Sequence, residues 1–183
     1  MNDKTPGTLW FVIGPSGAGK DTLIALARER LQGSDTLFAH RYITRPADAG
    51  GENHVALSNA EFCARECRGS FALAWRRNGL AYGVGAEVCD WLEKGLDVVV
   101  NGSRAALPAA RAHFATLVPV FVTASPDVLA ERLAKRGRED EVAITKRLAE
   151  AGAFTPPCDA RVIANDGAPE AGGAALFALL SRG

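Results

Sequence analysis

Residues 9–20 place an apolar run directly before a glycine-rich segment that ends in lysine, LWFVI followed by GPSGAGK. Glycines allow the backbone to turn so tightly that consecutive N–H groups converge on one anion, and a helix that follows adds its positive N-terminal end. Residues 14–20 fit the pattern G-x-x-x-x-G-K-[ST] up to its last position, where Asp21 stands. The order of strand, loop and helix therefore predicts a phosphate-binding loop in preference to an ordinary glycine-rich turn.

The predicted loop gives a phosphate-binding role to each residue from its first glycine to the start of the helix. These residues are Gly14, Pro15, Ser16, Gly17, Ala18, Gly19, Lys20, Asp21 and Thr22. Lys20 is expected to bridge the β- and γ-phosphates of a nucleotide as a point charge. A carboxylate in the first helical turn is favoured by the helix dipole and is a hard oxygen ligand. Asp21 is therefore expected to bind Mg²⁺, directly or through water, with the Thr22 hydroxyl as the alternative.

Strand-like and helix-like segments alternate along the chain. We expect strands at 9–13, 37–43, 97–101, 117–123 and 160–164, and helices at 20–32, 58–67, 85–94, 104–114, 126–136, 140–152 and 169–181. Two of the strands are apolar without alternation, as in strands that are covered on both faces, which predicts an α/β fold with a parallel sheet flanked by helices. Two short strand-like runs around Asn78-Gly79 interrupt the alternation and suit a small acceptor-binding lobe at about 44–83.

Composition indicates a compact enzyme more than a nucleic-acid-binding protein. The chain has 183 residues, is 48% hydrophobic and carries 21 basic and 21 acidic side chains. This length and apolar content predict one domain, 1–183, with a sizeable core. Zero net charge argues against bulk binding to nucleic acid or to a membrane surface. The opening residues MNDKTPGT are not apolar and no run approaches about 18 apolar residues, so we expect a cytoplasmic protein.

A polar segment, HRYITRPADAGGENH, follows the second expected strand at residues 40–54. It suits an anionic acceptor, because Arg45 can bind a phosphate through two parallel hydrogen bonds. A solvated loop is the alternative interpretation. His54, beside Glu52, is the histidine for which we expect a role in the site.

Two further clusters can carry chemistry. Asn101-Gly102-Ser103-Arg104 follows a buried strand, at the edge where ligands bind in open α/β sheets, although ordinary turn chemistry explains it equally well. The run RLAKRGRE at 132–139, with Arg147 one helix later, resembles a lid at about 132–147 that closes over a triphosphate. A solvated basic helix end is the alternative there.

The order of these parts resembles that of the guanylate-kinase group of nucleoside monophosphate kinases. The matching pieces are GPSGAGK at 14–20, Thr44-Arg45, Gly51-Glu52, Trp75 with Tyr82-Gly83, the arginines of 132–137, Arg147-Leu148 and Asn165-Asp166. The chain departs from that group where guanine is read: Ala47-Asp48 replace a second arginine, His54-Val55 stand near a missing tyrosine, and Val99 replaces an acid. A pocket that lacks these polar partners would discriminate guanine poorly.

A narrower resemblance is to ribose 1,5-bisphosphate phosphokinases of phosphonate catabolism. It rests on the strings GPSGAGKD, HRYITR, GENHVALS, NGLAYGV, VVVNGSR and RGRE. The resemblance implies transfer of a phosphoryl group from ATP, with Mg²⁺, to ribose 1,5-bisphosphate, which forms ADP and 5-phosphoribosyl 1-diphosphate (PRPP). In that family the loop usually ends in Lys-Asp. Because the acceptor is an already ionised phosphate, no general base is expected, and catalysis is alignment with charge neutralisation.

Roles for individual residues follow from this resemblance. Lys20 and the loop would hold the ATP phosphates, and the lid arginines Arg136, Arg138 and Arg147 the transferring group. The acceptor phosphates would lie on Arg45, Tyr82 and Arg104, the ribose or 1-phosphate end on Glu52, Asn53, His54 and Asn101, and the adenine by Asn165 and Asp166.

Two other interpretations stay open from the sequence. One is a nucleoside monophosphate kinase on the same fold. The other is a non-catalytic guanylate-kinase-like interaction module, which has no use for Lys20 or for the lid arginines. The expected partner is a small-molecule substrate, and the oligomeric state is open, with a homodimer as a candidate.

Overall fold

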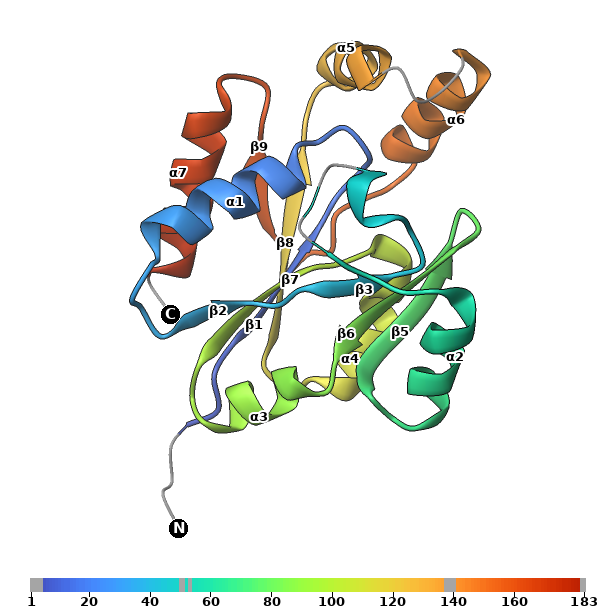
Figure 1. The fold of residues 1–183 in the computed structure, drawn as a ribbon. Helices are drawn as coiled ribbons and strands as arrows, with labels where there is room; N and C mark the ends of the chain where they lie inside the picture. The colour runs from blue at the N-terminus through green and yellow to red at the C-terminus, as the bar shows by residue number, and fades with distance from the viewer. Residues whose placement is uncertain (1–4, 50–51, 53, 137–140, 182–183) are drawn as a thin grey trace. The chain divides into compact units, whose positions relative to one another are not determined.

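The computed structural model describes residues 5–49, 52, 54–136 and 141–181. The chain divides into two compact units, Met1–Phe11 with Gly33–Leu117, and Val12–Gln32 with Val118–Gly183. The boundary falls inside strand β1 (Leu9–Ile13), whose five residues are all buried. The main sheet has the strand order β2-β7-β1-β8-β9 (Figure 1). The single domain predicted for residues 1–183 stays a prediction.

The first unit contains strands β2 and β7 of the main sheet and a second sheet. Strands β2 (Thr36–Phe38) and β7 (Asp97–Asn101) pair in parallel. The second sheet has the order β4-β3-β6-β5. Its strands are β3 (Arg41–Ile43), β4 (Val55–Ala56), β5 (Phe71–Arg77) and β6 (Leu80–Gly85); the helices of this unit are α2 (Asn59–Cys67), α3 (Glu87–Glu93) and α4 (Leu107–His113), with 3-10 helices η1 (Ala47–Ala49) and η2 (Arg104–Ala106).

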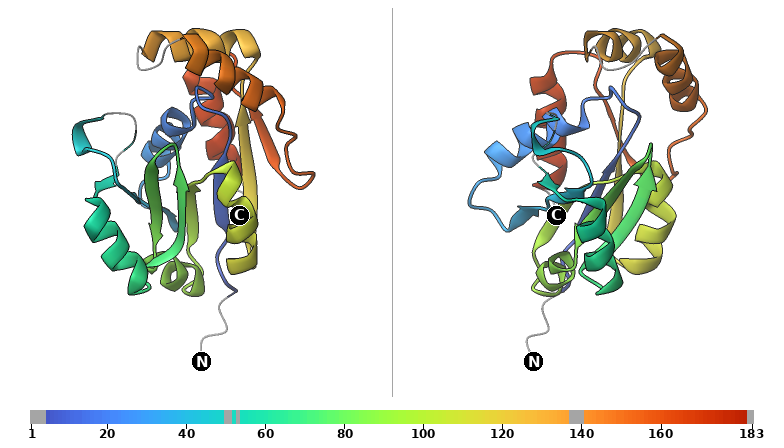
Figure 2. Two further views of the ribbon diagram at one scale, coloured as in Figure 1. Left: turned by 90° about the vertical axis from the view of Figure 1, so that its right-hand side faces the viewer. Right: turned by 45° about the vertical axis from the view of Figure 1, so that its right-hand side comes forward.

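The second sheet is built on a tight hairpin. Asn78 and Gly79, between β5 and β6, have φ values of 50° and 75°, the left-handed geometry that a two-residue hairpin turn requires. Helix α2 begins at the Ser58 cap, whose Oγ accepts the N–H of Glu61 at 3.1 Å. Helix α2 lies against one face of the sheet (Figure 2). Its Phe62 packs into a cluster formed with Leu57, Ala81, Tyr42, Phe71 and Ala74. The other face of this sheet carries the buried apolar side chains of Ile43, Trp75 and Val84 together with Arg41 and Tyr82.

The second unit carries the glycine-rich loop. Its strands β8 (Leu117–Thr123) and β9 (Arg161–Ala164) pair in parallel, and its helices are α1 (Lys20–Arg30), α5 (Pro126–Arg136), α6 (Glu141–Gly152) and α7 (Pro169–Leu180). Helices α1 and α7 lie side by side (Figure 1). At Gly14 a Cβ atom would lie 2.0 Å from the carbonyl oxygen of Val122, so only glycine allows the loop to begin this close to β8.

The predicted elements agree with this architecture, with two corrections. The strand predicted at 37–43 is two strands in different sheets, because the N–H of Ala39 still bonds to Val99 of β7 while Arg41 pairs with Val84 of β6. The helix predicted at 104–114 opens as η2 and becomes α-helical only from Leu107, next to Pro108 in the first helical turn. Within the described residues, none of the helices has the length and apolarity to cross a bilayer.

Candidate active site

The phosphate-binding loop has the backbone that its sequence predicts. Gly17 and Gly19 have φ values of 87° and 90°, in the region that glycine adopts without strain. Gly19 is the residue before α1, so the loop leads directly into the N-terminus of that helix. Lys20 is the first residue of the helix, and its Nζ donates to the carbonyl oxygens of Gly14 and Pro15 at 3.0 Å each. The ammonium group is thereby held at the loop, where an anion would bind.

The buried side-chain amide of Asn165 contacts the same loop. The Nδ2 of Asn165, which follows β9, donates to the carbonyl of Ala18 at 2.8 Å, and Asn165 is 3% exposed. Its backbone N–H bonds to Thr123 at 2.8 Å. The amide fits because its neighbours have no side chains: a Cβ atom at Gly19 would lie 2.5 Å from Nδ2, and one at Gly172 would lie 2.7 Å from Oδ1. Asn165 therefore fixes the position of the loop.

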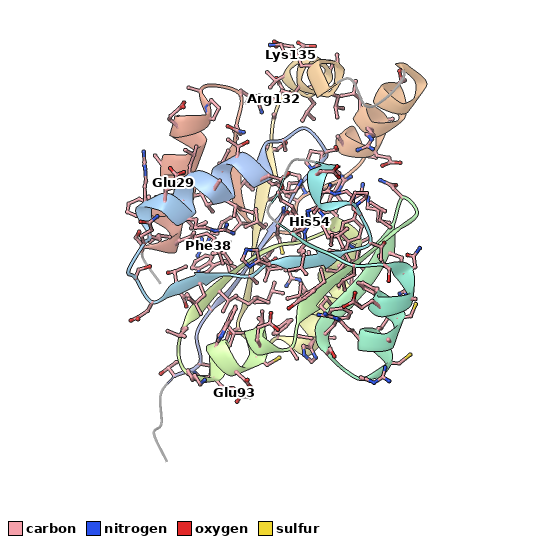
Figure 3. All side chains as sticks on the ribbon, in the orientation of Figure 1. Glu29, Phe38, His54, Glu93, Arg132 and Lys135 are labelled. Atoms are coloured by element: carbon pink, nitrogen blue, oxygen red, sulfur yellow. The ribbon has the colours of Figure 1, made fainter. Side chains whose placement is uncertain are left out.

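A cavity of about 230 Å³ adjoins the loop. It is lined by Gly17, Gly19, Thr22, Arg132, Lys135, Asn165 and Pro169. Arg132 and Lys135 both come from α5 (Figure 3). Arg132 Nη1 and Asn165 Oδ1 are buried and have no hydrogen-bond partner among the described residues. One donor and one acceptor beside a cavity suit a planar heterocycle that carries both kinds of group, such as a nucleobase.

The two acidic residues predicted for the nucleotide site lie at helix starts. Asp21 is half-buried in the first turn of α1. Asp166 Oδ1 accepts the backbone N–H of Ser125 at 2.5 Å, directly before α5, and this hydrogen bond holds the pKa of Asp166 below its usual range. In the structure Asp166 therefore caps α5, and its predicted place by the adenine stays a prediction.

The lid arginines are only partly described. Arg147 of α6 donates from Nη1 to Ser16 Oγ of the loop at 2.8 Å, which links that helix to the phosphate site. Arg136 is the last residue of α5. Arg138, and Asn53 of the acceptor set, lie outside the described residues. The closing movement of a lid stays a prediction.

In the first unit, His54 and Arg45 contact each other through two hydrogen bonds. His54 is 9% exposed; its Nδ1 lies 3.2 Å from Arg45 Nη2, and its Nε2 lies 3.2 Å from the carbonyl oxygen of Arg45. A hydrogen on Nε2 satisfies the two Arg45 contacts, since Nδ1 then accepts from Nη2, but it leaves the Glu52 carbonyl beside Nδ1 without a donor from this ring. Nδ1 also lies 3.1 Å from the carbonyl of Glu52. The imidazole is thus occupied with protein groups and orients Arg45, whose buried Nε has no partner among the described residues.

The other acceptor residues form a second group around Glu52. Its Oε2 accepts Nδ2 of Asn101, at the end of β7, at 2.7 Å, and its Oε1 accepts Nε of Arg41 at 2.8 Å. The Arg41 guanidinium also lies 5.2 Å from the ring centre of Tyr82. Arg104 is half-buried in η2. Sequence reasoning missed Arg41; the signal was the strand alternation, which places it on the same face as Ile43.

A glycine-rich loop between a parallel strand and a helix, with a basic residue on it and a cavity beside it, defines a P-loop nucleotide-binding protein. Residues 11–151 match the family described as an AAA domain. The crystal structure of guanylate kinase from Anaplasma phagocytophilum superposes with a TM-score of 0.72 and 17% identity, over 98% of this chain and 87% of that one. The predicted fold class, a guanylate-kinase-like P-loop α/β protein, is confirmed.

Relatives by sequence are much closer. Ribose 1,5-bisphosphate phosphokinase PhnN of Chromobacterium violaceum is 62% identical over 183 residues, which are 100% of this chain and 98% of the relative. The protein of the same name from Laribacter hongkongensis is 63% identical over 175 residues, 96% of this chain and 43% of that longer relative. The chain belongs to the ribose 1,5-bisphosphate phosphokinase PhnN family, and it is a kinase. The resemblance inferred from the sequence strings is confirmed.

Proposed function

We propose that this chain transfers the γ-phosphoryl group of ATP to the 1-phosphate of ribose 1,5-bisphosphate, forming PRPP and ADP. The observation that carries the proposal is the 62% identity, over the full length, to a relative named for this activity. Its setting in the cell, as a cytoplasmic step of phosphonate catabolism, remains a prediction.

The nucleotide half of the reaction is assigned to the second unit. The N–H groups of the loop and the Lys20 ammonium bind the phosphates, and the cavity beside Asn165 and Arg132 takes the adenine. The hydrogen bond from Arg147 to Ser16 of the loop supports a role for its guanidinium in neutralising charge on the transferring group, with Arg136 and Arg138 as further predicted contributors.

The residues present fit Mg²⁺. Proteins bind this ion with one or two carboxylates, and the phosphates of the substrate and water complete its octahedron. Asp21 supplies such a carboxylate in the first turn of α1, beside Lys20, and Thr22 and Ser16 add hydroxyl oxygens. The ion would neutralise charge on the β- and γ-phosphates. Asp21 is the residue that we propose to hold it.

The acceptor half is assigned to the first unit, where Arg45, held by His54, binds an acceptor phosphate. Asn101, Tyr82 and Arg104 are proposed to complete that half. An oxygen of the 1-phosphate attacks the γ-phosphorus; the new P–O bond forms as the bond to the β–γ bridging oxygen breaks, and ADP leaves. A phosphate monoester has its second pKa at about 6, so the attacking oxygen is already ionised at neutral pH and no base is required.

The test is an ADP-release assay of the purified protein with ATP and Mg²⁺, comparing ribose 1,5-bisphosphate with GMP as acceptor. We expect turnover with the sugar bisphosphate alone, and a product one phosphoryl group heavier by mass spectrometry. The Lys20→Met variant is the control for contaminating kinases. Turnover with GMP alone, or with neither acceptor, contradicts the proposal.

A further inference from the structure

We infer that Arg41 is a positioning residue that makes the acceptor half select a sugar phosphate over a nucleotide. It acts by holding the Tyr82 ring and the Glu52 carboxylate in fixed, occupied arrangements. This inference rests on the proposed function, and it concerns a residue outside the predicted site.

The first observation concerns the Tyr82 ring. Strand β6 lies between β3 and β5, and Tyr82 pairs with Ile43 on one side and Trp75 on the other. Arg41 shares the face of Ile43, two residues along β3. The Trp75 ring stacks on Tyr82 at 5.4 Å and 5°, and the Arg41 guanidinium lies 5.2 Å from the Tyr82 ring centre. Because the two neighbours come from opposite strands, they cover opposite faces of the ring.

A covered ring has a direct consequence for specificity. A purine acceptor gains affinity by stacking on an exposed aromatic face, and such stacking contributes about 1–3 kcal/mol per base. With Trp75 and Arg41 against it, the Tyr82 ring offers a base less open face than a free ring would, while its edge and its hydroxyl group remain. The group that remains accessible suits a hydrogen bond to a phosphate or a ribose hydroxyl, which a sugar bisphosphate supplies.

The second observation concerns the Glu52 carboxylate. Arg41 Nε and Nη2 bind its two oxygens as a parallel pair, and Asn101 Nδ2 donates to Oε2 at 2.7 Å. The side chains of Arg41 and Glu52 are only 13% and 12% exposed. Each phosphate of the acceptor carries a charge of about −1.5 to −2 at neutral pH, so an unpaired carboxylate here would repel it. Arg41 removes that repulsion and fixes Glu52 against Asn101.

Arg41 and Arg45 therefore have different roles. The Arg41 guanidinium binds Glu52 through two contacts. Arg45 donates to His54 from Nη2, and its buried Nε has no partner in the described part of the chain. Arg45 is thus the guanidinium with donors left for a phosphate, and Arg41 shapes the surroundings without binding it.

The test compares Arg41→Met with a control on α2, the helix that packs on the opposite face of the same sheet. Arg65 also pairs with a glutamate, Glu61, at 2.6 Å and lies 5.4 Å from a tyrosine ring, Tyr42. In Arg41→Met we expect the KM for ribose 1,5-bisphosphate to rise about tenfold or more, with kcat and the KM for ATP within about threefold. GMP is measured as a competitive inhibitor, and the ratio of its Ki to the KM for ribose 1,5-bisphosphate should be lower in Arg41→Met than in the wild type. Arg65→Met should match the wild type.

A second variant separates a positioning role from a merely structural one. If Arg41 acts by neutralising Glu52, then adding Glu52→Gln to Arg41→Met removes the unpaired charge and lowers the acceptor KM again, by about threefold or more. If Glu52 is instead an independent ligand of the acceptor, the double variant has a higher KM than either single variant, and the inference is wrong. Arg41→Lys, which keeps the charge but not the two-pronged contact, replaces Arg41→Met if that variant does not fold.

The remaining outcomes are also distinct. Wild-type turnover of ribose 1,5-bisphosphate with no difference between Arg41→Met and Arg65→Met overturns the inference and leaves the proposed function intact. Absence of wild-type turnover with this acceptor overturns the proposed function and the inference with it.

Discussion

Asn165 joins three segments of the second unit through one small side chain and its own backbone. Its amide bonds to the phosphate loop at Ala18, its N–H bonds to β8 at Thr123, and its side chain lies against α7 at Gly172. A hydrogen bond between buried groups contributes about 1 kcal/mol, and leaving one buried partner unpaired costs about 1–3 kcal/mol. The position of the loop therefore depends on an amide that contacts it from outside the motif.

Asn165→Asp keeps the shape of this side chain and exchanges the donor for an oxygen that faces the Ala18 carbonyl. We expect the KM for ATP to rise about tenfold, the equivalent of about 1.4 kcal/mol, with the acceptor KM unchanged. Steady-state kinetics with each substrate varied in turn measures both constants. Asn78→Asp, in the exposed hairpin turn, is the control. Unchanged ATP kinetics in Asn165→Asp would mean that Asn165 does not position the loop.

At the scale of elements, the start of α5 depends on a distant acid. The carbonyl oxygen of Ser125 accepts the N–H of Leu129 in the first turn, and the N–H of Ser125 donates to the Asp166 carboxylate. This arrangement connects the segment after β9 to the helix that carries Arg132. A carboxylate at a helix N-terminus also interacts favourably with the helix dipole.

The lowered pKa of Asp166 gives this contact a defined pH dependence. Since the folded pKa lies below the unfolded value, the stabilisation is complete above about pH 4 and is lost as the pH falls through the folded pKa. Asp166→Ala should lower the urea midpoint of unfolding at neutral pH, and the difference from the wild type should vanish in acid. Asp166→Asn keeps an acceptor that does not titrate, so the gap between Asp166→Asn and Asp166→Ala should not vary with pH. A gap between wild type and Asp166→Ala that is constant with pH would contradict the assignment.

The sequence predicts the order of these elements because their signals are local. Strands β1, β7 and β8 contain continuous apolar runs, the Ser58 cap precedes α2, and α5 begins at Pro126. The separation of β2 from β3 could not be predicted, because residues 37–43 form one strand-like run. Only their partners, β7 and β6, show that the chain changes sheets after Ala39.

The same distinction holds for the site. The phosphate loop could be found because its residues are contiguous. The role inferred for Arg41 could not, since it depends on the register with β6 and on Glu52, eleven residues away in the chain. The sequence pointed to His54 as a ligand, but which groups its ring contacts depends on the path of the loop between Arg45 and Glu52.

At the scale of the whole molecule, each half of the proposed site is contained in its own unit. The contacts of the phosphate loop run to Asn165 and Arg147, in the unit formed by Val12–Gln32 and Val118–Gly183. Those of the acceptor half run among Arg41, Glu52 and Asn101 in the other unit. Substitutions in one half should therefore leave the binding of the other ligand intact.

Ligand-induced thermal shifts test this independence. A ligand at about 100 times its Kd adds about 2.7 kcal/mol, which raises the Tm of a chain of this length by about 5 to 10 °C. Lys20→Met should lose the shift caused by a non-hydrolysable ATP analogue with Mg²⁺ and keep the shift caused by ribose 1,5-bisphosphate. Arg45→Met should show the reverse. If either variant loses both shifts while its unliganded Tm is unchanged, the two ligands do not bind independently.

The fit of Asn165 between two glycines also constrains how the chain can change during evolution. Position 19 is far from positions 165 and 172 in the sequence, yet the amide occupies the space that side chains at both glycines would need. A lineage that shortened residue 165 would remove the nearest obstacle to alanine at position 172, leaving the Leu23 side chain, 3.1 Å from the new Cβ, to shift slightly, whereas position 19 would stay glycine because of its φ of 90°. Alanine at 172 would in turn select against asparagine at 165. Positions 165 and 172 should therefore co-vary among relatives, while position 19 should not.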